Sequence, residues 1–175
     1  MTVSTRIRAC AVLATLVAVA ACDDKQKAQV PTAPISVAPD AVSAYVAASN
    51  TNPGVGSNVT LFVRARRGSQ VGPIGSFTIR LSYDSTRLRF VESPRSTIGM
   101  VMANPTTRGL VIAAGAAAEG FTDDNLFSAT FAVTGANALQ SVALHVTELN
   151  TVTFKDQRAN TRVERALYRD AGSQR

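Results

Sequence analysis

A strand, a turn and a second strand are predicted by residues 74–92, which have the sequence IGSFTIRLSYDSTRLRFVE. Large apolar side chains occupy every second position of the first strand, which is the period of a β-strand. Exposing Phe77, Ile79 and Leu81 to water together would cost about 1.5 to 3 kcal/mol each, so they must face a core. The opposite, solvated face of this strand then carries Ser76, Thr78 and Arg80.

The turn between these two strands has signals of its own. Tyr83 continues the core face, where its ring can pack while its hydroxyl finds a polar partner. The carboxylate of Asp84 can accept hydrogen bonds from the amides of the turn that follows. The second strand begins at Leu88 and ends before Pro94, which cannot donate to a ladder.

Short stretches with the same alternation, separated by Gly, Pro, Asn and Asp, continue along the rest of the chain. The predicted strands cover residues 41–48, 58–66, 74–83, 88–91, 97–102, 109–115, 126–133 and 142–146. The small, Gly-interrupted run 113–118 favours close sheet packing or a bulge. No long helix and no solenoid repeat is visible, so the sequence predicts an all-β fold, an antiparallel sandwich of two sheets.

Composition excludes several classes of site. The chain is 46% hydrophobic and 17% charged, which is typical of a globular domain, and it contains no Trp and one His. His145 falls on the outward face of its strand, without a second His or a Cys for zinc and without a nucleophile for a triad. Five acidic residues could supply a glycosidase pair but are interpreted as solvated: Glu92, Glu119, Asp123, Asp124 and Glu148. We expect no enzyme activity, no metal and no cofactor, with calcium at the turn 123–125 left open.

The N-terminus has the pattern of an export signal. Arg6 and Arg8 precede an apolar run that is shorter than the roughly 20 residues of a membrane-spanning helix. The run ends in Val19-Ala20-Ala21-Cys22, which resembles the lipobox of bacterial lipoproteins, so we predict a cleaved signal peptide over residues 1–21 and acylation of Cys22. An ordinary signal peptide with an incidental cysteine is the alternative. The chain is therefore expected to be exported and lipid-anchored to the bacterial cell envelope, on the inner or the outer membrane.

The remaining chain divides into three parts. Residues 22–39 are rich in Lys, Gln, Ala and Pro and predict a flexible tether, residues 40–168 form the sandwich, and residues 169–175 are a basic tail. Removal of Cys10 with the signal leaves the domain without a disulfide.

Four arginines recur near the C-terminus at almost helical spacing: Arg158, Arg162, Arg165 and Arg169. A basic helix touching lipid headgroups or nucleic acid is one interpretation, and a solvated tail or edge strand is the preferred one; we expect no nucleic-acid partner.

Four segments of the domain resemble cohesin domains in their order and spacing. They are Val59–Val63, then Ile74–Asp84 with Leu88–Val91, then Asp124–Phe131 and Val152–Asp156. The resemblance implies a jelly-roll sandwich of about nine strands, a non-catalytic fold that some carbohydrate-binding modules share. It also implies that the segment from Val163 to Tyr168 returns as a last strand beside the first.

Cohesins bind dockerins, small calcium-loaded helical modules, through one flat sheet face. By this resemblance Ser76, Thr78 and Arg80 contribute to a partner-binding face. Characterised cohesins often carry Asn and Asp at the first two of these three positions. The expected partner is a dockerin-bearing secreted protein involved in polysaccharide breakdown. A carbohydrate-binding module and a structural envelope lipoprotein are the alternatives. Binding of polysaccharide normally needs exposed aromatic platforms, whereas most Phe and Tyr residues here alternate inward.

Overall fold

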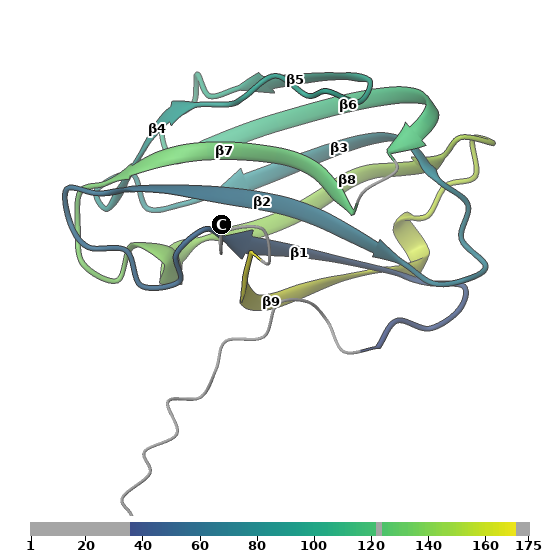
Figure 1. The fold of residues 1–175 in the computed structure, drawn as a ribbon, viewed down its shortest axis with the longest axis horizontal. Helices are drawn as coiled ribbons and strands as arrows, with labels where there is room; N and C mark the ends of the chain where they lie inside the picture. Colours follow the sequence, from purple (N-terminus) through teal and green to yellow (C-terminus); the bar gives the residue numbers. More distant parts are fainter. Residues whose placement is uncertain (1–35, 122–123, 171–175) are drawn as a thin grey trace, which may run out of the picture.

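Two β-sheets packed face to face make up the protein in a computed structural model, which describes residues 36–121 and 124–170 (Figure 1). The strands are β1 Val42–Ala48, β2 Asn58–Arg67, β3 Ile74–Ser82, β4 Leu88–Glu92, β5 Met100–Asn104, β6 Leu110–Phe121, β7 Asn125–Val133, β8 Ala143–Thr151 and β9 Thr161–Arg169. Two short 3₁₀ helices join them, η1 Ala138–Ser141 and η2 Arg158–Asn160. The predicted all-β sandwich of about nine strands is confirmed.

The strand order shows how the chain divides between the sheets. The five-stranded sheet has the order β4-β7-β2-β1-β9, and the four-stranded sheet has the order β5-β6-β3-β8. The pairs are antiparallel except that β9 lies parallel to β1, which departs from a purely antiparallel sandwich. The last strand therefore returns beside the first, as expected. Residues 158–169 form η2 and β9, so the alternative of a basic helix is wrong.

The alternation in β3 has the predicted consequence. Phe77, Ile79 and Leu81 are at most 1% exposed and lie in the core between the sheets. Tyr83 packs edge-to-face on Phe131, with 5.0 Å between the ring centroids. These contacts join the end of β3 in one sheet to β7 in the other, so the strand predicted best from sequence also connects the two layers.

The turn after β3 is closed by Asp84, as predicted. The hydroxyl and the backbone amide of Thr86 donate to the Asp84 carboxylate at 2.6 and 2.8 Å. These hydrogen bonds, with the nearby Arg87 guanidinium, hold the pKa of the Asp84 carboxyl below its ordinary value. The backbone amide of Asp84 in turn donates to the Ser141 hydroxyl, which ties this turn to η1.

The small residues of β6 allow both of the features predicted for them. A Cβ at Gly115 would lie 2.5 Å from Cε1 of Phe77, so the glycine lets this ring pack against the backbone of β6. The register between β3 and β6 also shifts between Ile74 and Ser76, which is a bulge. Close packing and irregular pairing therefore occur in the same strand.

The ends of the chain are described only in part. Cys22, the predicted signal peptide and the tether up to residue 35 lie outside the described residues. The expected basic tail starts at residue 169, whereas β9 includes Arg169, and Asp170 is buried with its carboxylate paired to Arg64. Among the described residues no helix has the length and apolar character needed to span a membrane.

Candidate functional site

The outer face of the four-stranded sheet, called the sheet face below, carries three rows of side chains that cross all four strands. Taken in the order β5, β6, β3 and β8, the rows are Met100–Ala116–Ser76–Asn150, Met102–Ala114–Thr78–Glu148 and Asn104–Ile112–Arg80–His145. Every residue of these rows is exposed or half-buried, whereas the alternate positions of β3 point into the core. Apart from Asn104 at the end of β5, the rows divide the sheet face into an apolar half on β5 and β6 and a polar half on β3 and β8.

The polar half is organised around one carboxylate. Glu148 accepts hydrogen bonds from the hydroxyls of Ser76 and Thr78 at 3.2 and 3.3 Å. It also accepts one from the side-chain amide of Asn150 at 2.8 Å, and the same amide donates to the Ser76 hydroxyl at 3.2 Å. Three donors from two strands therefore fix the orientation of a half-buried carboxylate before any partner arrives, which lowers the entropy cost of using it.

The apolar half is formed by two long side chains beside a strand of small ones. Met100 and Met102 are 70% and 69% exposed, and their register partners on β6 are Ala116 and Ala114. Methionine adapts its shape to what packs on it, and the alanines leave the surface between β5 and β3 low. A solvated apolar strip beside a preorganised polar cluster is typical of a binding surface.

No family model and no curated protein matches the chain. Several solved structures do match its fold. One is the sixth cohesin of scaffoldin B from Acetivibrio cellulolyticus, in complex with the Cel5 dockerin, with a TM-score of 0.56 and 15% identity over 73% of this chain and 98% of that one. Another is a non-cellulosomal cohesin from the archaeon Archaeoglobus fulgidus, with a TM-score of 0.53 and 16% identity over 70% and 86%.

The domain has the cohesin fold. A type II cohesin domain from the cellulosome of Acetivibrio cellulolyticus gives the same result, with a TM-score of 0.55 and 12% identity over 76% of this chain and 97% of that one. The chain thus covers nearly the full length of each of these cohesins, and the fold expected from the sequence resemblance is confirmed.

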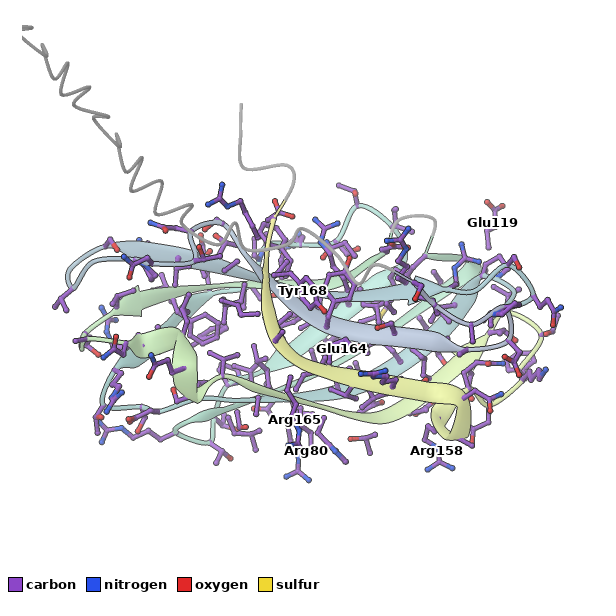
Figure 2. The ribbon with its side chains drawn as sticks, turned by 90° about the horizontal axis from the view of Figure 1, so that it is seen from below. Arg80, Glu119, Arg158, Glu164, Arg165 and Tyr168 are labelled. Carbon is purple, nitrogen blue, oxygen red and sulfur yellow. The ribbon has the colours of Figure 1, made fainter. Side chains whose placement is uncertain are left out.

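Within this cohesin fold, the three residues predicted for a binding face share one strand and one side of the sheet. Ser76 and Thr78 are half-buried, and each donates a hydrogen bond from its hydroxyl to Glu148 in the polar half. Arg80 is exposed, projects away from the molecule (Figure 2) and pairs in register with His145, whose side chain is also outward as expected. Contact of these residues with a partner stays a prediction.

Four residues of the sheet face were missed by the sequence analysis: Met100, Met102, Glu148 and Asn150. Strict alternation from Leu144 and Val146 places residue 148 in the core, but β8 has a bulge between Val146 and Glu148 that reverses which side faces out. Nothing in the local sequence marks this bulge. For the methionines the sequence did contain a signal, since residues 100 and 102 are two positions apart and must point to the same side of the predicted strand 97–102.

The acids considered for catalysis do not share one strand, and although Glu119 on β6 and Glu148 on β8 share the four-stranded sheet, β3 separates their strands. Glu148 is on β8 of the four-stranded sheet, whereas Glu92 ends β4 of the five-stranded sheet. Asp123 lies outside the described residues. Among the residues that are described, no three His, Cys, Asp or Glu side chains gather as metal ligands would.

Proposed function

We propose that this chain is an exported, lipid-anchored protein-binding module whose sheet face captures a dockerin-like module of a secreted protein. In this proposal the domain has no catalytic role, and its partner takes part in polysaccharide breakdown. The lipid on Cys22 would hold the domain at the cell envelope, and residues 22–39 would give it reach.

The observation that carries the proposal is the division of the sheet face into two halves. Met100 and Met102 offer apolar area that is 70% and 69% exposed, and Glu148 offers a carboxylate already oriented by three hydrogen bonds. Well-packed apolar contacts flanked by oriented polar groups are what a folded protein partner requires. A cohesin of similar fold was solved with a dockerin bound, which supports the same class of partner here.

A polysaccharide is a less suitable ligand for this surface. None of the residues in the three rows of the sheet face is Phe, Tyr or Trp. Sugar rings usually stack on exposed aromatic side chains, and flexible methionines on a flat alanine strip do not replace them. The sheet face therefore supports a protein partner over a carbohydrate.

The proposal can be tested with purified, calcium-loaded dockerin modules from secreted proteins of the same cell. Binding of each module to the full chain would be measured by isothermal titration. Met102→Glu places a charge in the apolar half and should weaken binding by about tenfold or more. The partner would then have to cover a carboxylate with apolar contacts, which removes the water around the charge. Arg80→Glu tests the polar half in the same way.

Two matched controls lie outside the sheet face. Val55 is 64% exposed in the turn between β1 and β2, and Arg89 is an exposed arginine on β4 of the other sheet. Val55→Glu and Arg89→Glu should leave the affinity unchanged. Equal losses in all four variants would indicate non-specific charge effects, and unchanged binding by Met102→Glu and Arg80→Glu would exclude the sheet face as the binding surface.

A further inference from the structure

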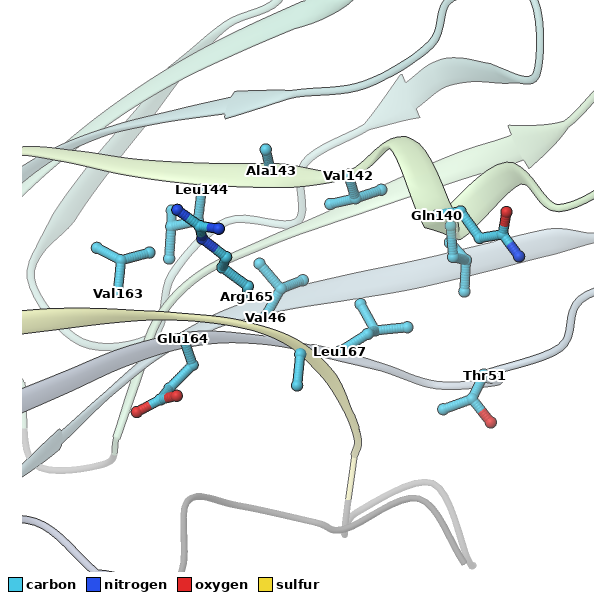
Figure 3. A pocket seen from close by; sticks show the side chains of 12 residues that line it. Val46, Thr51, Gln140, Val142, Ala143, Leu144, Val163, Glu164, Arg165 and Leu167 are labelled. Carbon is cyan, nitrogen blue, oxygen red and sulfur yellow. The ribbon is translucent and has the colours of Figure 1, made fainter. Parts of the chain in front are cut away.

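A second surface feature lies at the open side of the sandwich, where the two sheets end. β8 is the edge strand of one sheet and β9 is the edge strand of the other, and neither pairs with the other in a ladder. Between them and η1 is a groove of about 720 Å³, called the seam groove below (Figure 3). Its size is within the range of small-molecule binding sites, about 300 to 1,000 Å³.

The lining of the seam groove is largely aliphatic. Its apolar side chains larger than alanine are Val46, Leu139, Val142, Leu144, Val163 and Leu167. Val142, Leu144 and Leu167 pack against the main core yet stay half-exposed, so the groove is a place where the core reaches solvent. Among the described residues, the lining contains no aromatic ring, which favours a flexible hydrocarbon chain over a sugar.

Of the two charged side chains that line the groove in the described part of the chain, Glu164 is already paired and Arg165 is free to bind a ligand. Glu164 is engaged, since the Arg162 guanidinium lies 3.2 Å away and the Ser43 hydroxyl donates to it at 3.1 Å. Arg165 is exposed and has no hydrogen bond or ion pair within residues 36–121 and 124–170. Figure 3 shows its side chain reaching across the groove toward Leu144, while Glu164 points away. The groove therefore presents one available positive charge.

Arg165 lies within an irregular part of β9. Ala44 pairs with Val163 and Val46 with Leu167, so two residues of β1 are matched by four residues of β9. The extra residues form a bulge that contains Arg165, and bulges in edge strands often redirect a side chain toward a site. Val163 and Leu167, on either side of the bulge, still line the groove.

We propose that the seam groove binds a long-chain carboxylate, with the hydrocarbon chain along the aliphatic lining and the carboxylate on Arg165. A guanidinium presents two parallel N–H donors that match the two oxygens of one carboxylate. One available cation beside an aliphatic groove thus complements a molecule with one anionic head and one apolar tail. This site is separate from the sheet face, so it does not depend on the dockerin proposal.

The test uses the full chain and dansyl-undecanoic acid as a fluorescent probe. Laurate, below its micellar concentration, should displace the probe more strongly than dodecanol does. Arg165→Gln should weaken laurate binding by about tenfold and abolish its advantage over dodecanol, because a charge-assisted hydrogen bond is lost. Leu167→Glu should weaken both ligands. Circular dichroism would show that each variant keeps the β fold.

Arg169→Gln is the matched control, since Arg169 is on the same strand but outside the lining of the groove. The apolar segment 9–21 is common to all variants, so binding there cancels in the comparison. Three results would overturn the proposal: no displacement by laurate, equal displacement by laurate and dodecanol in the wild type, or equal losses in Arg165→Gln and Arg169→Gln. Displacement by an apolar peptide but not by laurate would instead assign the groove to an extended polypeptide.

Discussion

At the scale of single residues, an ion pair with a buried carboxylate connects Asp170, just after β9, to Arg64 on β2. The carboxylate of Asp170 pairs with the guanidinium of Arg64, and the two side chains are 5% and 24% exposed. The same guanidinium lies over the ring of Phe62, 5.5 Å from its centroid. Arg64 Nε has no hydrogen-bond partner in the described part of the chain, where Asp170 is the main compensation for this partly buried charge.

Asp170→Ala should therefore destabilise the domain by about 2 kcal/mol, less than the loss for a fully buried pair because Arg64 keeps some solvent. The measurement is urea unfolding followed by circular dichroism. Asp156→Ala is the control, since Asp156 pairs with Arg158 and both side chains are at least half exposed. It should change stability much less, because solvent screens the pair. Equal losses in the two variants would contradict a special role for Asp170.

At the scale of strands, the sequence predicts an element well when alternation is regular and poorly at bulges. β3 is regular along its buried positions, and its core and solvent faces follow directly from Phe77, Ile79 and Leu81. In β8 one extra residue changes which side of the sheet the following residues face, and in β9 two extra residues interrupt the ladder; both bulges depend on pairing with distant strands and leave no local signal. The bulge in β8 places the Glu148 carboxylate on the sheet face, and the bulge in β9 contains Arg165 of the seam groove. These were the parts of the sites that sequence reasoning could not locate.

β5 and β6 show two further reasons why the predicted ends of strands were wrong. The predicted strand 97–102 begins only at Met100, because Gly99 adopts a left-handed conformation with φ of 67° and ends a turn. β6 continues to Phe121, beyond the predicted end at residue 115. Its Ala and Gly residues have low strand propensity, but pairing with β3 and β5 on both sides overrides this.

The packing of β6 on β3 can be tested at Gly115. Gly115→Ala should destabilise the domain by about 1 to 3 kcal/mol, because the new Cβ would lie 2.5 Å from Cε1 of Phe77, a ring held in the core. Gly54→Ala is the control, since no atom lies within 4 Å of a Cβ there. Thermal unfolding would compare both with the wild type. A Gly115→Ala variant as stable as Gly54→Ala would show that the ring moves away without cost.

At the scale of the whole molecule, one strand serves both candidate surfaces. Leu144 of β8 lines the seam groove, while His145 and Glu148 face outward on the sheet face. The two surfaces therefore meet along β8 but present different chemistry, an aliphatic channel with one cation and a broad face with an oriented carboxylate. All the residues named for the two surfaces lie between Val46 and Leu167, within the described part of the chain.

In the proposed function, anchoring depends on one thiol, that of Cys22. Cys22→Ala removes the predicted acyl acceptor and should leave a precursor that is neither lipidated nor cleaved after residue 21. Since each buried methylene contributes about 0.8 kcal/mol, two or three acyl chains would hold the mature protein on a membrane. An uncleaved signal segment also binds membranes, so fractionation alone is insufficient. Labelling of cells with palmitate and the mass of the purified chain should show acylation in the wild type and in the control Cys10→Ala, and none in Cys22→Ala. Normal labelling of Cys22→Ala would refute the lipoprotein prediction.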